Sequence, residues 1–206
     1  SSRRRHTRLL RSLVGSEMCI RDRARDLKGE EGNVIAVIGD GSLSGGEALE
    51  GIDFAGEMDT NFIIVVNDND MSIAENHGGM YRNLKLLRDT DGKAECNLFK
   101  AMGLDYVFVK DGNDIPSLIE AFEGVKDRKK PVVVHIVTQK GKGYAPAEKD
   151  KETWHWHMPF DPETGKSLYN SEGEDYGTVT CNYLLEKMQA DKSVCATVSY
   201  THLTLP

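Results

Sequence analysis

The segment NVIAVIGDGSLSGG, residues 33–46, ends an apolar run on glycine, aspartate and further glycines. Short apolar runs bounded by glycine are typical of strands that are buried on both faces of a parallel sheet. Similar runs recur at 62–66, 106–109 and 132–137, with stretches of helical spacing between them. Because strands alternate with helices, the sequence predicts an α/β fold, a doubly wound parallel sheet with helices on both faces.

The helices are predicted from apolar spacing and from capping residues. Residues 44–56 begin with Ser44, and Glu47 follows three positions later, which is a capping-box pattern. The stretch 115–125 has helical spacing, and Pro116 is acceptable in its first turn. The remaining elements are expected as helices at 94–102 and 177–190, and as a strand that begins at 193–195.

The composition excludes several classes of protein. Hydrophobic residues make up 39% and charged residues 29% of the 206 positions, as in ordinary soluble globular proteins. No run approaches the ~20 apolar residues of a membrane helix, which excludes a spanning protein. The four cysteines are scattered with no C-x-x-C pair, and this pattern indicates a reducing, cytoplasmic compartment.

The two ends of the chain differ from the rest in charge or in the kind of sequence they contain. Residues 1–23 hold seven arginines against two acidic residues, whereas the remainder carries 19 basic and 31 acidic side chains. Because this remainder carries a large excess of negative charge, it is not expected to bind the phosphate backbone of nucleic acids. Residues 1–23 and 197–206 resemble translated sequencing adapters and are expected to be non-native tails. The main α/β domain is expected at 24–165, and 166–196 is expected to be a linker and the start of a second domain.

Two of the predicted strands end in polar clusters, GDGS at 39–42 and NDNDMS at 67–72. Ligands of doubly wound sheets bind beyond the carboxyl ends of the strands. Since one crossover separates Asp40 from Asn69, both loops are expected side by side at the same edge of the sheet. Carboxylate, amide and carbonyl oxygens suit Mg²⁺, which completes its shell with water and phosphate oxygens.

Each cluster alone has a purely structural explanation that is equally good. Gly-Asp-Gly occurs in many turns, and Asn-Asp-Asn can satisfy local backbone groups. Together, after two neighbouring buried strands, the clusters favour a metal–diphosphate site. The pattern fits neither the Rossmann G-x-G-x-x-G motif nor the P-loop.

Residues 39–69 resemble the thiamine-diphosphate fingerprint of transketolases and their relatives. Residues 37–50, 66–73 and 138–148 are more specifically similar to the 1-deoxy-D-xylulose-5-phosphate synthase family. The resemblance implies the thiamine-diphosphate-binding fold, with thiamine diphosphate and Mg²⁺ as cofactors. It implies an enzyme, a homodimer at full length, that joins pyruvate to glyceraldehyde 3-phosphate with release of CO₂. The product would serve isoprenoid, thiamine and pyridoxal biosynthesis.

Carried over position by position, the resemblance implies a set of site residues. Asp40, the side chain of Asn69 and the main-chain carbonyl of Met71 would be the Mg²⁺ ligands. Lys140 and Lys142 could face phosphate, or could equally be solvated lysines on a flexible glycine loop. The contacts to thiamine diphosphate would be Gly41, Ser42, Asn69 and Tyr144.

The sequence departs from the family pattern at the position of Asn113, where the family usually has histidine and asparagine cannot titrate. His77 could compensate as an acid–base group, although a lone loop histidine is more often on the surface. His155 resembles a histidine of the family in this part of the chain. An H-x-H metal site at 155–157 is disfavoured because no third ligand is evident.

Two other functions stay open. A transketolase-like ketol transferase shares the cofactor site, but residues 43–46 (LSGG) lack the Glu-Gly pair of transketolases and favour the synthase. A non-catalytic Mg²⁺–diphosphate-binding module is the alternative of a different class. In the synthase family the glutamate that protonates the cofactor lies in the second, pyrimidine-binding domain. The catalytic residues are therefore unknown, with His77 and His155 as candidates, and the 206 residues alone are expected to be inactive.

Overall fold

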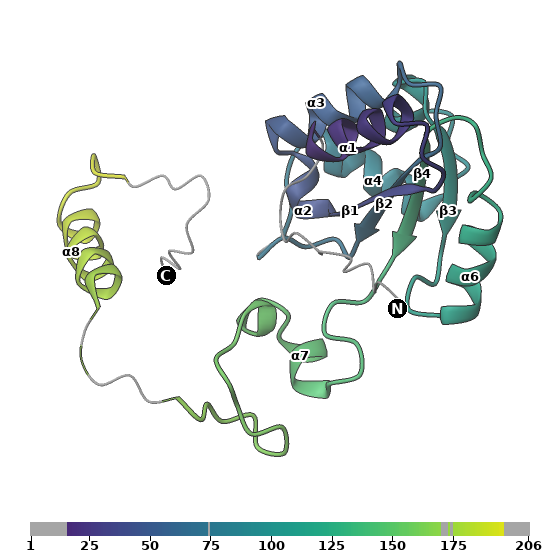
Figure 1. Cartoon of the computed structure of the whole chain (residues 1–206). Helices are drawn as coiled ribbons and strands as arrows, with labels where there is room; N and C mark the ends of the chain where they lie inside the picture. The colour runs from purple at the N-terminus through teal and green to yellow at the C-terminus, as the bar shows by residue number, and fades with distance from the viewer. Residues whose placement is uncertain (1–15, 74, 170–172, 174, 196–206) are drawn as a thin grey trace. The chain divides into compact units, whose positions relative to one another are not determined.

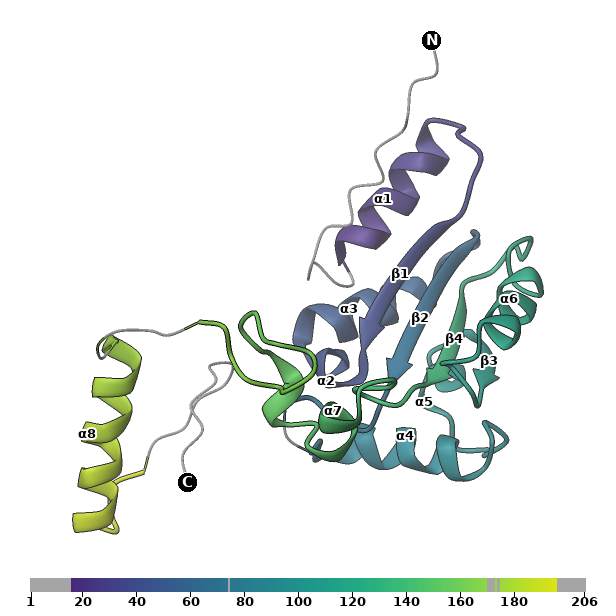
Figure 2. The same cartoon turned by 90° about the horizontal axis from the view of Figure 1, so that it is seen from below.

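The computed structural model describes residues 16–73, 75–169, 173 and 175–195. The chain divides after Trp156 into two units. In the first unit the strands are β1 (Val34–Gly39), β2 (Phe62–Asp68), β3 (Asp105–Val109) and β4 (Val132–Val137). Its helices are α1 (Ser16–Leu27), α2 (Asp40–Leu43), α3 (Gly46–Ala55), α4 (Gly79–Asp89), α5 (Leu98–Ala101), α6 (Ile115–Glu123), α7 (Ala145–Lys149) and the 3-10 turn η1 (Thr153–His155). Figure 1 labels these helices apart from α5, which is labelled in Figure 2, and η1.

The four strands form one parallel sheet in the order β1-β2-β4-β3. Gly39 at the end of β1 pairs with Asn67, and Asp68 at the end of β2 pairs with Val137. The carboxyl ends of these strands therefore lie side by side along the C-terminal edge of the sheet, beyond which ligands of such sheets bind.

Helices cover both faces of the sheet (Figure 2). On one face, side chains of β1 and β2 pack with those of α3, α4 and α5, among them Ile52, Leu84 and Phe99. On the other face, side chains of β2 and β4 pack with α6 through Leu118 and Phe122. The doubly wound α/β fold predicted from the sequence is confirmed.

The edge strand β1 is buried on one face only. Ala36 and Ile38 are buried, whereas Ile35 is 43% and Val37 is 66% exposed. The prediction that this strand is buried on both faces was wrong, because α6 packs on β2, β3 and β4 and the apolar run alone does not reveal an edge position. The prediction fits β2 and β4, whose residues are nearly all buried.

The sequence analysis missed helix α4 and misplaced the start of α3. Gly78 and the polar stretch before α4 suggest a loop, yet Leu84 and Leu87 are fully buried at helical spacing. The expected capping box does not form, because α3 is capped by Gly45 without a side-chain hydrogen bond. Ser44 Oγ instead accepts a hydrogen bond from Tyr81 Oη at 2.7 Å.

The remaining elements agree with the sequence in part. Helix α6 begins after Asp114, whose side chain accepts a hydrogen bond from Ser117 N. The helix expected at 94–102 is the short α5. In the second unit, α8 (Tyr176–Ala190) begins after Asp175, and residues 193–195 do not form the expected strand.

The domain boundaries expected from the sequence stay predictions. Helix α1 crosses the expected boundary at residue 23, and Cys19 in this helix is buried in the same core cluster as α3. Residues 1–15 and 196–206 lie outside the described residues. In the described part of the chain, no helix is both long and apolar enough to cross a membrane.

Candidate functional site

The candidate site lies at the carboxyl ends of β1 and β2. Asp40 is the first residue of α2, directly after β1, and is only 2% exposed. Asn69 follows β2 directly. The backbone N–H groups of Gly41 and Asn69 both face the Asp40 carboxylate and favour its ionised form. The structure thus brings together the two polar clusters that the sequence places after neighbouring strands.

The environment of the Asp40 carboxylate disfavours its ionised form. Burial, together with the negative charge of Asp68, raises the pKa of Asp40 from its ordinary value of 3.8 to about 6. Asn76 Nδ2 donates a hydrogen bond to Asp40 Oδ2 at 2.8 Å. Because a buried carboxylate beside a second acid is costly to ionise, a bound cation would stabilise it.

The loop after β2 carries the buried side-chain amide oxygen of Asn69. Asn69 Oδ1 is buried, and none of the described residues donates a hydrogen bond to it. Buried polar atoms without partners are uncommon in folded proteins and call for an explanation such as an absent ion. Met71, two residues further on, forms a bridge with Glu75 that turns the chain back.

Gly41 allows the two loops to touch. A Cβ at this position would lie 2.7 Å from Ser72 Cβ and Oγ, and 2.9 Å from Ser72 Cα. The Gly41 carbonyl accepts a hydrogen bond from Tyr81 Oη at 3.3 Å. Ser42, which the resemblance assigns to the cofactor, is exposed in the same short helix.

The close approach at Gly41 makes a testable prediction. The Gly41→Ala variant should lose about 1–3 kcal/mol of unfolding free energy, because its methyl group must displace Ser72. Gly46→Ala is the matched control, since a Cβ there meets nothing within 4 Å. Urea unfolding of both variants measures the difference, and equal midpoints would show that the loops can separate at no cost.

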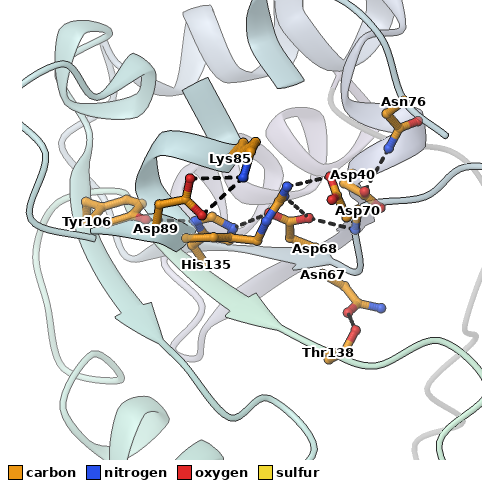
Figure 3. A network of polar contacts seen from close by, with 11 residues as sticks. Asp40, Asn67, Asp68, Asp70, Asn76, Lys85, Asp89, Tyr106, His135 and Thr138 are labelled. Carbon is orange, nitrogen blue, oxygen red and sulfur yellow. Dashed lines mark hydrogen bonds and ion pairs between the residues drawn. The ribbon is translucent and has the colours of Figure 1, made fainter. Parts of the chain in front are cut away.

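A buried polar network lies behind the loop after β2 (Figure 3). Asp68 and His135 are both completely buried. His135 Nε2 lies 2.9 Å from Asp68 Oδ2, and Tyr106 Oη lies 2.7 Å from His135 Nδ1. Arg88 Nη1 donates to both oxygens of Asp68, at 2.8 and 2.7 Å. The network joins α4 to β2, β4 and β3.

The network sets the protonation states of Asp68 and Tyr106 at neutral pH. Burial alone would raise the pKa of Asp68, but hydrogen bonds from His135 and Arg88 hold it below its ordinary value. Burial and the charge of Asp68 raise the pKa of Tyr106. At neutral pH Asp68 is therefore ionised and the Tyr106 hydroxyl is protonated.

The loop after β4 reaches the site through Lys140. Lys140 Nζ donates to the Ser72 carbonyl and lies 2.9 Å from His155 Nδ1. Burial lowers the pKa of Lys140, while the charge of Asp40 acts in the opposite direction. Lys140 thus brings a positive charge to the loop that faces Gly41.

Asn113, which stands where the family usually has histidine, supports the same loop. Its Oδ1 accepts a hydrogen bond from Gln139 N at 2.7 Å. Thr138 Oγ1 donates to Asn67 Oδ1 at 2.6 Å, which ties the start of the loop to the end of β2. Asn113 therefore has a structural contact that does not require titration.

The other candidates lie on two segments. Tyr144 precedes α7, and its ring packs edge-on against Trp154 with 5.0 Å between ring centroids. His155 is exposed beside Lys140. His77 is exposed in the segment before α4.

Sequence reasoning missed Arg88, His135, Tyr106 and Asn76. His135 is a titratable residue inside an apolar strand, and that is a signal for a buried hydrogen-bond network. Arg88 lies in α4, a helix that was not predicted from the sequence. Their partners are distant in sequence, so spacing alone could not join them.

The donor set suits Mg²⁺ better than a metal that needs nitrogen or sulfur ligands. Asp40 offers a buried carboxylate and Met71 a carbonyl on the loop after β2. Asn69 offers an amide oxygen to which no described residue donates a hydrogen bond. No cluster of three or more His, Cys, Asp or Glu in the described ranges could hold a metal. Mg²⁺ typically takes few protein oxygens and retains water and phosphate ligands.

The sequence model of the 1-deoxy-D-xylulose-5-phosphate synthase family matches residues 16–95 and 88–138. The chain belongs to this family. The synthase of Listeria monocytogenes is 40% identical over 181 residues, covering 84% of this chain and 30% of the relative. That of Desulforudis audaxviator is 37% identical over 210 residues, covering 84% and 33%. The chain therefore spans about a third of the length of these curated synthases.

A solved structure supports the fold of this synthase-family chain. The transketolase from Campylobacter jejuni aligns with a TM-score of 0.50 and 23% identity, covering 64% of this chain and 20% of that chain. The similarity shows a shared fold, in agreement with the parallel sheet and its helices on both faces.

Proposed function

We propose that this chain holds the diphosphate of thiamine diphosphate through Mg²⁺, as part of a longer 1-deoxy-D-xylulose-5-phosphate synthase. The proposed reaction joins pyruvate to glyceraldehyde 3-phosphate and releases CO₂. The observation that carries the proposal is that buried Asp40 faces the backbone N–H of Asn69, whose side-chain oxygen is buried and accepts no hydrogen bond from the described residues. Family membership supports the choice of reaction.

The proposed ligands come from the two loops. Asp40, Asn69 Oδ1 and the Met71 carbonyl would hold Mg²⁺, and the lack of a Cβ at Gly41 would let a phosphate approach the backbone. Lys140 adds positive charge beside Ser72. The further contacts to the cofactor would be made by Ser42, Asn69 and Tyr144.

When bound, thiamine diphosphate supplies the carbanion chemistry that decarboxylation of pyruvate requires. The residues of this chain bind and orient the diphosphate end. Asp40 provides the charge that Mg²⁺ neutralises, and Asn69 contributes a neutral oxygen. The proton-transfer residues stay unknown, and the 206 residues alone are proposed to be inactive.

The same proposal extends to the setting of the enzyme. The acidic composition supports small-molecule substrates rather than nucleic acid, and the scattered cysteines support a cytoplasmic location. By its resemblance to the family, the full-length enzyme would be a homodimer that supplies isoprenoid, thiamine and pyridoxal biosynthesis.

The reaction is tested with the uninterrupted protein that contains this chain. The purified protein is incubated with thiamine diphosphate, Mg²⁺ and pyruvate, and CO₂ release is measured with and without glyceraldehyde 3-phosphate. Release that depends on the aldehyde, with 1-deoxy-D-xylulose 5-phosphate as the product, is the expected result. Ketol transfer from a sugar-phosphate donor without release from pyruvate would instead identify a transketolase-like enzyme. Cofactor binding with neither activity would leave a binding module.

The Asn69→Ala variant tests the proposed ligand directly. Because Asn69 Oδ1 accepts no hydrogen bond from the described residues, its removal should leave stability nearly unchanged. Mg²⁺-dependent affinity for thiamine diphosphate should fall by about tenfold or more. Calorimetric titration measures the affinity, and Asn182→Ala on the exposed surface of α8 is the control. Unchanged affinity in Asn69→Ala would remove Asn69 from the site.

A further inference from the structure

Arg88 holds both residues that flank Asn69. It lies in the last turn of α4, and its side chain is 14% exposed. Arg88 Nη1 donates to both oxygens of Asp68, at 2.8 and 2.7 Å. Arg88 Nη2 forms an ion pair with Asp70. A single guanidinium thus spans the turn whose middle residue is Asn69.

The turn itself adopts a conformation that needs support. Asp70 has a φ of 62°, in the left-handed region that residues with a Cβ seldom adopt. The backbone N–H of Asp70 donates to Asp68 Oδ1 at 3.0 Å. Since such backbone conformations persist where the surroundings over-determine them, the two contacts from Arg88 stabilise this turn.

Asp68 in turn is anchored from the sheet. As an ionised carboxylate it only accepts hydrogen bonds, so His135 Nε2 carries the proton that faces it. Tyr106 Oη lies 2.7 Å from His135 Nδ1, at the other nitrogen of the ring. Asp68 is therefore fixed between Arg88 on one side and a buried histidine on the other, with little freedom to rotate.

We propose that Arg88 is a positioning residue for the metal donors, since it fixes the Asp68–Asp70 turn and thereby directs the oxygens of Asn69 and Met71. The inference rests on the proposed function, because it names what orients the donors of that same site. Within the described residues the hydrogen bonds of Arg88 go to Asp68 and Asp70 and not to Asn69 or Met71, so its effect passes through the turn. Groups that orient ligands in this way influence metal affinity strongly.

The same helix provides a matched control. Lys85 lies one turn before Arg88 and forms an ion pair with Asp89 at 3.0 Å. Both partners are exposed, at 65% and 59%. Lys85→Met and Arg88→Met therefore remove the same charge from the same helix, but only Arg88 reaches the turn.

The test uses the uninterrupted protein. Calorimetry measures Mg²⁺ affinity in the presence of thiamine diphosphate, and thermal unfolding without either ligand measures the fold. Arg88→Met should weaken Mg²⁺ binding by about tenfold or more, while Lys85→Met leaves it unchanged. Arg88→Lys keeps the charge but has one nitrogen in place of the fork, so it should fold like wild type and still bind Mg²⁺ more weakly.

The outcomes separate this inference from the proposed function. If wild type shows no Mg²⁺-dependent binding of thiamine diphosphate, the proposed function fails. If wild type binds and both Arg88 variants bind equally well, the inference is overturned. If Arg88→Met does not fold, Arg88→Lys decides, because a merely structural arginine would show wild-type affinity once the fold is restored.

Discussion

Replacing Asp68 by alanine should lower the free energy of unfolding by about 3–5 kcal/mol, since it leaves buried charge and hydrogen-bonding groups without a partner. Asp68 is completely buried and accepts hydrogen bonds from Arg88 and His135. The expected loss is large because two donors, the completely buried His135 and the largely buried Arg88, lose their acceptor at once.

Asp105→Ala is the matched control for that experiment. Asp105 also pairs with an arginine, Arg128, at 2.7 Å, but the two side chains are 47% and 37% exposed. Exposed pairs contribute about 0–1 kcal/mol. Urea unfolding of the 206-residue chain compares the two variants. A loss in Asp68→Ala no greater than in Asp105→Ala would show that the network contributes nothing to the fold.

Replacing Asp40 by asparagine should have opposite effects on stability and on binding. The Asp40 carboxylate is buried near Asp68, so its charge is unfavourable in the metal-free protein. Asparagine removes that charge and retains one oxygen. We expect Asp40→Asn to be at least as stable as wild type in EDTA at pH 7, and to lose Mg²⁺-dependent cofactor binding by about 100-fold or more.

The pH dependence of stability follows from the raised pKa of Asp40. Its value is about 6 in the folded protein and 3.8 ordinarily, so the folded state favours the protonated form. This contribution is fully present below pH 3.8 and is lost as the pH rises through 6. Relative to Asp40→Asn, metal-free wild type should therefore lose roughly 2 kcal/mol of stability between pH 4 and pH 7.

Urea unfolding at several pH values in EDTA checks this difference. The comparison with Asp40→Asn cancels the other titrating groups, which both proteins share. A stability difference that does not change over this pH range would mean that the Asp40 carboxylate is well solvated. That result would weaken the case for a buried cation ligand at the end of β1.

The part of the candidate site that depends on local sequence patterns could be predicted. An apolar run that ends in a polar cluster marks the end of a strand, and Asp40 and Asn69 each follow one. The parallel crossover between them then places both at one edge, as the pairing of Gly39 with Asn67 shows. This prediction did not require any side-chain contact that the sequence pattern leaves unmarked.

The network behind the site could not be predicted in this way. His135 lies in an apolar strand, and its partners Asp68 and Tyr106 are 67 and 29 residues away. Only the strand order β1-β2-β4-β3 brings these positions together. Arg88 lies in α4, whose apolar spacing is preceded by glycines and polar residues that favour a loop. The exposure of one face of β1 likewise follows from its position at the edge of the sheet, which its own apolar sequence does not reveal.

The account rests on one claim, that the loops after β1 and β2 bind a diphosphate through Mg²⁺. It is tested most directly by titrating the uninterrupted protein with thiamine diphosphate, in Mg²⁺ and in EDTA, with thiamine monophosphate as the comparison ligand. The account predicts tight binding of the diphosphate in Mg²⁺ only, and weak binding of the monophosphate under both conditions. Equal affinity for the diphosphate in Mg²⁺ and in EDTA would contradict it.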